Sequence, residues 1–386
     1  MTLRIPSPIA GLLAVVVTAL VACSGSDADG TPNVRVAFFQ DLSVPDHVDL
    51  VSPSFLAFDM AVQRRLVERG ATAEVVQFDT RGDAGTAIEM AEEVAADGSF
   101  VLAVAAPFWR EPAEVGRILA EAGVPTMSLS PVSGSPWLEP SSPPGDPAAL
   151  WRRLVPDRAS EASLLAEVAG QRSPEGEPQP VCLVGDGSPY GRGLVDQVEA
   201  GLGGWPSTRI DGTAPVEAAD AVATTGCRVV VWGGFPPGAR ELARAMRAAG
   251  SARGRPVDLA GDALKTTIPP TSPAGDGGVV GSVACSCVDV SLELGLPSRR
   301  FLNAYQSEHG LAPGVYAAEA WDAGRLAAGA ITGGALDRVA MQAAFTTFTT
   351  YEGVARTYAF DADGELVGVE PGLFAAAGTR WLPLPT

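Results

Sequence analysis

The sequence is poor in lysine and histidine, two residues on which much enzyme chemistry depends. Its only lysine is Lys265, and its only histidines are His47 and His309. Amine nucleophiles and phosphate-loop lysines therefore have a single candidate, and histidine-based metal sites or Ser/His and Cys/His nucleophile pairs have few ways to form. This composition disfavours most hydrolase mechanisms.

Positive charge as a whole is also scarce. The chain has 27 basic and 45 acidic residues, which gives a formal net charge of −18. A nucleic-acid surface needs clustered lysine and arginine to neutralise phosphates, and the sequence contains no basic face of that kind. We therefore expect no nucleic-acid partner.

Long apolar runs are absent after the N-terminus. The run over residues 9–22 is too short for a comfortable bilayer span and follows a short segment with one positive charge, Arg4, which is typical of a signal peptide. The run ends Leu-Val-Ala-Cys at Cys23 and so resembles the bacterial lipobox, in which the cysteine is diacylated on sulfur before cleavage. We expect residues 1–22 to be a signal peptide and 23–33 a lipidated tether, which places the protein outside the cytoplasm, anchored to the cell membrane. An ordinary secretory signal with an accidental cysteine is the alternative.

The remaining four cysteines are interpreted for an oxidising compartment. Cys182 and Cys227 lie near the N-terminal ends of apolar runs that could be adjacent parallel strands, so we favour a disulfide between them. Cys285 and Cys287 are separated by one residue, which leaves either a local bridge or two thiols. A metal site there is the weaker alternative, because neither a histidine nor a second cysteine pair is nearby, and no metal is expected.

Short β-branched runs alternate with alanine-rich amphipathic segments in the first third of the chain. The pattern predicts strands over residues 34–39, 73–78, 100–105 and 125–129, and helices over 53–69, 84–96 and 113–122. Alternation of this kind implies a parallel sheet that is covered on both faces.

The same alternation resumes after a proline-rich loop over residues 133–147. Helices are expected over 159–171, 193–202, 216–224 and 239–249, and strands over 181–184, 208–210, 229–232 and 257–260. Residues 279–290 are expected to be extended, 298–310, 315–331 and 336–348 helical, and 355–360 and 364–369 a hairpin.

These two series predict an α/β fold of two doubly wound parallel-sheet lobes joined by a hinge of several strands. Lobe one is expected over residues 34–152 plus 279–350, and lobe two over residues 153–278 plus 351–386. A ligand should bind between the lobes, outside the carboxyl ends of the strands.

Several short motifs follow one another in a fixed order. They are the helix segment at residues 54–62, Val-Pro-Thr-Met-Ser at 124–128, Tyr-Gly at 190–191, Phe-x-x-x-Tyr at 301–305, Trp-Asp-Ala at 321–323 and Phe-Asp-Ala-Asp-Gly-Glu at 360–365. In this order the chain resembles the type I periplasmic solute-binding proteins of ABC importers, in particular the Leu/Ile/Val-binding branch. Trp321 stands where that family usually has a tyrosine.

The resemblance implies a binding protein whose two lobes close on a small polar solute, an amino acid or a related compound. Its partners would be that solute and the ABC permease subunits, and it would act as a monomer, without a cofactor and without enzymatic activity. The same fold used as a ligand-sensing lobe for a membrane receptor or kinase is an alternative that the sequence does not separate from the first.

In lobe one, the resemblance places ligand contacts in the loops that follow the strands. The loop after residue 105 has no serine, so Trp109 or Arg110 would project in place of the usual hydroxyl. Ser130 matches the second ligand loop, and Gln40 ends the first strand. The structural alternatives are a turn-capping role for Ser130 and a solvated ion pair of Arg110 with Glu111.

In lobe two, the resemblance assigns ligand contacts to Tyr190, as an aromatic that packs on the solute, and to Asp262 and Lys265 at the end of a strand. Tyr190 could instead cap its loop, and Asp262 could be a helix N-cap.

An exported enzyme is the third function considered. The segment Gly-Asp-Gly-Ser-Pro-Tyr-Gly at residues 185–191 follows a predicted strand and is similar to a dinucleotide fingerprint. However, the third glycine of G-x-G-x-x-G would fall on Tyr190, and that glycine is needed for close packing of helix on strand. The enzyme hypothesis is therefore the least favoured.

Overall fold

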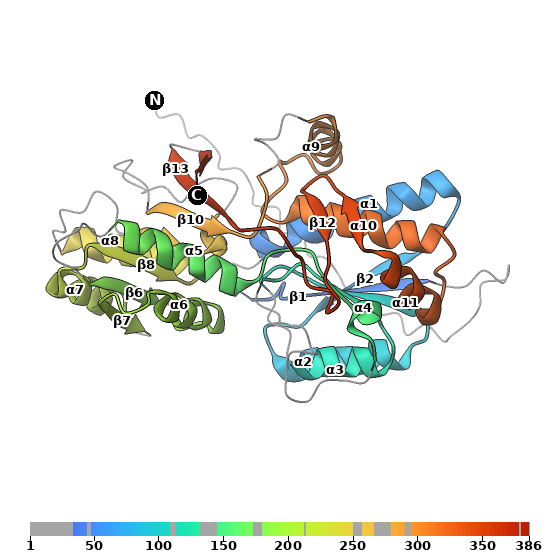
Figure 1. Cartoon of the computed structure of the whole chain (residues 1–386), viewed down its shortest axis with the longest axis horizontal. Helices are drawn as coiled ribbons and strands as arrows, with labels where there is room; N and C mark the ends of the chain where they lie inside the picture. The colour runs from blue at the N-terminus through green and yellow to red at the C-terminus, as the bar shows by residue number, and fades with distance from the viewer. Residues whose placement is uncertain are drawn as a thin grey trace, which may run out of the picture.

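The computed structural model describes residues 34–44, 48–108, 113–131, 145–172, 180–211, 214–249, 257–265, 279–289, 295–377 and 380–385. Within them the chain forms two α/β lobes that lie side by side along the long axis of the molecule (Figure 1). The predicted fold class, two parallel-sheet lobes flanked by helices, is confirmed.

Lobe one is built on a five-stranded sheet in the order β2-β1-β3-β4-β5, in which all pairs are parallel. The central strand β3 is buried at every residue because helices cover both faces of the sheet. The elements of lobe one are β1 (Arg35–Gln40), α1 (Val48–Arg69), β2 (Glu74–Asp79), α2 (Ala84–Ala96), β3 (Phe100–Ala105), α3 (Ala113–Glu121), β4 (Thr126–Ser128), α4 (Pro147–Leu150), β5 (Trp151–Arg153), α9 (Leu296–His309), α10 (Ala317–Thr332), α11 (Arg338–Thr347), β11 (Thr350–Glu352) and β12 (Thr357–Ala359).

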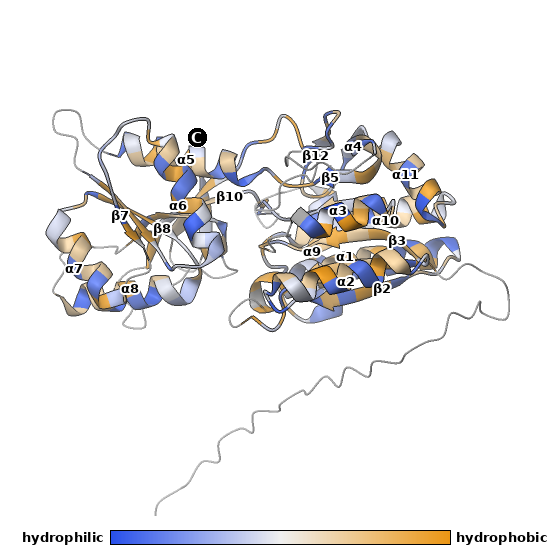
Figure 2. Ribbon diagram, turned by 90° about the horizontal axis from the view of Figure 1, so that it is seen from below, coloured by the Kyte–Doolittle hydropathy of each residue, from blue (hydrophilic) through white to orange (hydrophobic). Residues whose placement is uncertain are grey.

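Lobe two is built on a seven-stranded sheet in the order β14-β13-β10-β9-β8-β6-β7. Five of its strands are parallel, and β13 and β14 extend one edge in antiparallel fashion. Its apolar strands lie between helices, as the hydropathy colouring shows (Figure 2). The elements of lobe two are α5 (Arg158–Gln171), β6 (Val181–Gly185), α6 (Pro189–Gly201), β7 (Ser207–Asp211), α7 (Pro215–Thr225), β8 (Val229–Gly233), α8 (Pro236–Ala248), β9 (Val257–Ala260), the 3₁₀ helix η2 (Asp262–Leu264), β10 (Val280–Cys285), β13 (Gly372–Ala377) and β14 (Arg380–Leu384).

The chain passes between the lobes three times, after β5, after β10 and before β13. The expected boundaries differ from the structure at two of these crossings. Strand β10 pairs with β9 and β13 and therefore belongs to lobe two, although lobe one was expected to begin again at residue 279. Conversely, Tyr358 of β12 is buried in the core of lobe one, although lobe two was expected from residue 351. The sequence marked residues 279–290 and 355–360 as extended. It did not show which sheet each segment joins, because their pairing partners or packing neighbours lie far away along the chain.

Both remaining cysteine pairs form disulfides. Cys182 of β6 is joined to Cys227, which precedes the adjacent parallel strand β8, with 5.6 Å between the Cα atoms. This is the pairing that the sequence favoured. Cys285 and Cys287 form a local bridge with 5.1 Å between the Cα atoms, which was one of the two outcomes left open.

Within the described residues, no helix has the length and apolar character needed to span a membrane. The predicted signal peptide, the tether and the lipidation site Cys23 all lie outside the described residues.

Candidate functional site

Side chains of the two lobes meet at the carboxyl ends of the strands. Phe108, which follows β3 of lobe one, packs in the hydrophobic core of lobe two, as do Leu50 and Val51 at the start of α1. Helix α1 begins at Val48, before the predicted start at residue 53, and this early start is what carries Leu50 and Val51 to the second lobe. Tyr316, directly before α10 of lobe one, lies in the same cluster.

Asp262 is the centre of this contact region. It is the first residue of η2 in lobe two, with Gly261 as the N-cap, so Asp262 is not the N-cap itself. Its carboxylate is fully buried and accepts hydrogen bonds from two tyrosine hydroxyls, that of Tyr190 at 2.6 Å and that of Tyr316. Because Tyr190 belongs to α6 of lobe two and Tyr316 directly precedes α10 of lobe one, the carboxylate joins the two lobes.

Tyr190 is positioned by the first turn of α6. The helix begins at Pro189, with Ser188 as N-cap accepting from the Gly191 N–H at 2.9 Å, and not at residue 193 as predicted. This earlier start places the Tyr190 ring inside lobe two, where Phe235 packs on it at 5.0 Å between ring centroids. The structure therefore gives Tyr190 a role other than the loop cap that was considered.

Helix α5 adds a carboxylate and a guanidinium to the site. Glu161 Oε1 accepts from the Asp262 N–H at 2.9 Å. Arg158 lies over the Tyr190 ring, 4.7 Å from its centroid, and donates from Nη1 to the Tyr190 carbonyl at 3.3 Å. Its Nη2 is buried without a hydrogen-bond partner. Gly261 permits this packing, because a Cβ there would lie 2.6 Å from the Tyr190 hydroxyl and 2.7 Å from Glu161 Oε1.

The electrostatics of the site favour a positively charged guest. Burial raises the pKa of Asp262, and hydrogen bonds from Tyr190 and Tyr316 act in the opposite direction. Burial also raises the pKa of Glu161 well above its ordinary value, and the charge of Asp262 adds to that increase. Two buried carboxyl groups thus face one guanidinium, an arrangement that an added cation would stabilise.

Two residues of the site adopt strained backbone conformations. Phe108 and Tyr316 have φ angles of 63° and 60°, in the left-handed region that side chains other than glycine rarely occupy. Their rings contact each other edge to face, with centroids 5.6 Å apart. Such positions cost about 1–3 kcal/mol each and are concentrated at functional sites, which supports this location as the site.

Lys265 caps the C-terminus of η2, where its N–H donates to the Asp262 carbonyl at 2.8 Å, but its side chain has other partners than the Asp262 carboxylate. Its Nζ lies 3.6 Å from Asp289 Oδ2 and 4.3 Å from the centroid of the Phe374 ring, next to the second crossing between the lobes. Burial lowers the pKa of Lys265, and the nearby Asp289 acts against that change.

The predicted residues of lobe one have three different outcomes. Gln40 is fully buried at the end of β1, and neither its Nε2 nor its Oε1 has a hydrogen-bond partner. Ser130 is buried as well; its backbone N–H donates to Ser128 Oγ at 3.2 Å, and its carbonyl accepts from Arg153 Nη1 at 2.9 Å. Trp109 and Arg110 lie outside the described residues.

Sequence reasoning missed Phe108, Arg158, Glu161 and Tyr316. Phe108 follows a strand end, so the rule used for Ser130 could have found it. Arg158 and Glu161 lie on a helix whose sequence is typical of an ordinary solvent-exposed polar face. Tyr316 precedes a helix far along the chain. No local sequence signal therefore marks these three residues.

Over the part of the chain that the structure describes, no group of three His, Cys, Asp or Glu side chains could hold a metal ion.

Comparison with known proteins agrees with this architecture. The family model described as periplasmic binding protein matches residues 33–370. A search of curated proteins finds none that matches the chain. Among solved structures, an ABC transporter substrate-binding protein from Desulfitobacterium hafniense in complex with Leu has 19% identity and a TM-score of 0.66, covering 91% of this chain and 99% of its own.

Two further structures are similar in fold. A type 1 periplasmic binding protein from Bordetella pertussis Tohama I has 16% identity and a TM-score of 0.71, covering 91% of this chain and all of its own. A solute-binding protein of an ABC transporter from R. palustris in complex with benzoate has 14% identity and a TM-score of 0.68, covering 91% of this chain and 95% of its own. The chain therefore belongs to the periplasmic binding protein family, whose members bind solutes and are not enzymes.

Proposed function

We propose that the chain is the solute-binding subunit of an ABC importer and binds a small solute of the amino-acid type between its lobes. The observation that carries this proposal is the convergence of Tyr190 and Tyr316, from different lobes, on the buried carboxylate of Asp262. Because the hydrogen bond from Tyr316 to Asp262 joins the two lobes, a solute that changes the bonding of Asp262 would also change how readily the lobes close.

The polar groups of the site support a solute with both a cationic and an acceptor end. An ammonium group would be stabilised by the buried carboxyl groups of Asp262 and Glu161. Arg158 Nη2 is a buried donor without a partner, and a carboxylate could accept from it; the Gln40 amide, which is also unpartnered at the end of β1 in lobe one, is a second proposed donor. The aromatic rings of Phe108, Tyr190 and Tyr316 would supply apolar contact to the remainder of the solute.

Relatives of similar fold support the range of solutes. The D. hafniense protein was solved with Leu and the R. palustris protein with benzoate, both as components of ABC transporters. We extend this role to the present chain, with an extracytoplasmic location, a permease as partner and Cys23 as the lipid attachment point. Replacing Cys23 by alanine should release the protein from the membrane fraction if the lipid is its anchor.

The test is a thermal-shift screen of residues 33–386 against amino acids, amides, small peptides and aromatic carboxylates. A binding solute raises Tm in proportion to the logarithm of its concentration over its Kd, and it is recovered unchanged. The hit should then be titrated calorimetrically against the wild type and Asp262→Asn.

Asp262→Asn should weaken binding of an amino acid at least tenfold, because it removes the charge that an ammonium group would meet. The matched control is Tyr358→Phe. It removes the hydroxyl that donates to Asp322, another buried aspartate inside lobe one, and it should leave the affinity for the solute unchanged. Equal affinity of Asp262→Asn and the wild type would overturn the assigned site.

A further inference from the structure

The second crossing between the lobes begins with a disulfide that closes around a single residue. Cys285 is the last residue of β10 and pairs with Gly372 of β13, so it is fixed in the sheet of lobe two. Cys287 is the second residue beyond the strand, and its N–H donates to Cys285 Sγ at 3.2 Å. The bridge therefore fixes the direction in which the chain leaves lobe two.

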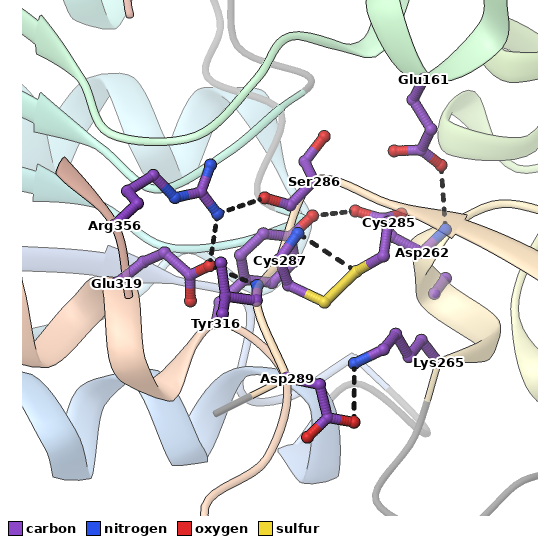
Figure 3. Close-up of a disulfide and its surroundings, with 12 residues drawn as sticks. Glu161, Asp262, Lys265, Cys285, Ser286, Cys287, Asp289, Tyr316, Glu319 and Arg356 are labelled. Carbon is purple, nitrogen blue, oxygen red and sulfur yellow. Dashed lines mark hydrogen bonds and ion pairs between the residues drawn. A yellow bond between two sulfur atoms is a disulfide. The ribbon is translucent and has the colours of Figure 1, made fainter. Parts of the chain in front are cut away.

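Lobe one holds the chain at the same point. Arg356 Nη2 donates to the Ser286 carbonyl at 2.8 Å, and Glu319 Oε1 accepts from the Val288 N–H at 2.6 Å. Arg356 and Glu319 also form a buried ion pair at 2.7 Å (Figure 3). Since Glu319 belongs to α10 and Arg356 precedes β12, the bridge has an attachment to lobe two on one side and to lobe one on the other.

A cavity of about 250 Å³ reaches this bridge. Its walls come from the crossing after β10 (Ser286, Cys287), the crossing before β13 (Val369), the edge strands of lobe two (Phe374, Pro383) and Arg356 of lobe one. Among these residues, Ser286 Oγ and Arg356 Nε and Nη1 are buried without a hydrogen-bond partner. The cavity has room for a molecule of a few heavy atoms and donors for its oxygen atoms, but not for a folded protein.

We propose that Cys285–Cys287 is a thiol–disulfide exchange site for a low-molecular-weight thiol, and that its reduction alters closure of the lobes. Cys287 lines the cavity and Cys285 does not, so the incoming thiolate meets Cys287 Sγ. This regulatory consequence rests on the proposed function, whereas the exchange itself does not.

The exchange proceeds in two balanced steps. The first thiolate forms a mixed disulfide with Cys287 Sγ as the Cys285–Cys287 bond breaks, and Cys285 leaves as a thiolate that takes the proton lost by the thiol. A second thiolate then attacks the sulfur of the bound thiol, which forms the disulfide of the small molecule and releases Cys287, again with uptake of one proton. Two thiols are oxidised to one disulfide, and the bridge is reduced to two cysteines.

The other disulfide provides the matched control. Like Cys285 and Cys287, Cys182 and Cys227 are buried in the core of lobe two, but they join β6 to the residue before β8, within one sheet. Neither Cys182 nor Cys227 lines the cavity that reaches the Cys285–Cys287 bridge. Their reduction would not free any connection between the lobes.

Exchange is tested on the oxidised protein with free L-cysteine, a thiol small enough for the cavity, by trapping free thiols with iodoacetamide and identifying the alkylated peptides by mass spectrometry. Cys285 and Cys287 should be alkylated at least ten times faster than Cys182 and Cys227, under conditions in which the circular dichroism spectrum is unchanged. Equal rates, or faster reaction of the Cys182–Cys227 pair, would overturn the proposal.

The consequence for closure is tested with the double variants C285S/C287S and C182S/C227S. In small-angle scattering without solute, the radius of gyration of C285S/C287S should differ from that of the wild type, whereas that of C182S/C227S should not. The affinity of C285S/C287S for L-leucine, or for the amino acid with the largest thermal shift in the screen above, should change at least threefold. Unchanged scattering and affinity would refute the hinge role, and if no amino acid binds, the scattering and alkylation results decide it alone.

Discussion

Asp262 and Asp322 have similar local chemistry and opposite places in the architecture. Both are fully buried, both accept a hydrogen bond from a tyrosine hydroxyl, and burial raises the pKa of each. The donors to Asp262 come from both lobes, whereas those to Asp322 come from lobe one alone.

The surroundings of Asp322 show what a purely structural carboxylate needs. It projects from α10 and accepts from the N–H groups of Val354 and Ala355 at 2.7 and 2.8 Å and from the Tyr358 hydroxyl at 3.0 Å. A Cβ at Gly353 would lie 2.2 Å from its Oδ2, so the loop wraps tightly around the carboxylate. Burial and a raised pKa therefore do not identify a binding site. The origin of the donors, in one rigid body or in two, separates the two aspartates.

The largest effect on stability is expected from Asp322→Ala. The change leaves two backbone N–H groups and one hydroxyl buried without an acceptor, which should lower the free energy of unfolding by about 3 kcal/mol. Urea unfolding followed by circular dichroism measures this loss. A protein as stable as the wild type would show that water reaches these donors and that Asp322 is not the anchor of the loop.

The next effect is a pH dependence. Burial raises the pKa of Asp322 to about 7 from its usual value near 3.8, so the folded state binds this proton more tightly than the unfolded state. The associated stability is fully present below about pH 4 and is lost as pH rises through 7. Between pH 5 and 7 the wild type should lose about 2 kcal/mol relative to Asp322→Asn, which does not titrate. Parallel stability curves for the two proteins would contradict the raised pKa.

The smallest effect distinguishes the two aspartates most directly. Tyr316→Phe removes the donor that crosses from lobe one to Asp262, and Tyr358→Phe removes the donor that stays within lobe one. We expect Tyr316→Phe to weaken solute binding by about 1 kcal/mol, roughly fivefold, with little loss of Tm. Tyr358→Phe should lower Tm and leave the affinity unchanged. Calorimetric titration and thermal unfolding of both variants measure this, and equal affinity losses would remove the distinction.

Much of the fold followed from local patterns. Helix α2, strand β3 and strand β9 have the predicted bounds, because α2 is an amphipathic run and β3 and β9 are short strand-like runs with marked ends. Strands β13 and β14 were missed. Strand β13 is the alanine-rich sequence Gly-Leu-Phe-Ala-Ala-Ala, and β14 contains Pro383, which is tolerated because β14 lies at the edge of the sheet.

The candidate site was predictable only where a strand end marks it. Tyr190 and Asp262 follow β6 and β9, so the general rule for α/β sheets pointed to both. Arg158 and Tyr316 reach the site through helices whose placement depends on how the two lobes pack. No spacing within one segment encodes that packing. The sequence therefore did not identify Tyr316, the residue of lobe one that donates the second hydrogen bond to Asp262.

The antiparallel strands at the edge of lobe two have a consequence for biosynthesis. Strand β10 pairs with β13, which is made only after all of α9, α10 and α11, and β14 lies a few residues from the end of the chain. A nascent chain on the ribosome can complete the sheet of lobe one earlier, but the sheet of lobe two has an open edge until β13 and β14 have been translated. Premature termination between residue 366 and β13 would therefore leave a complete lobe one attached to a lobe two whose strand β10 is exposed at the edge of its sheet and can template aggregation.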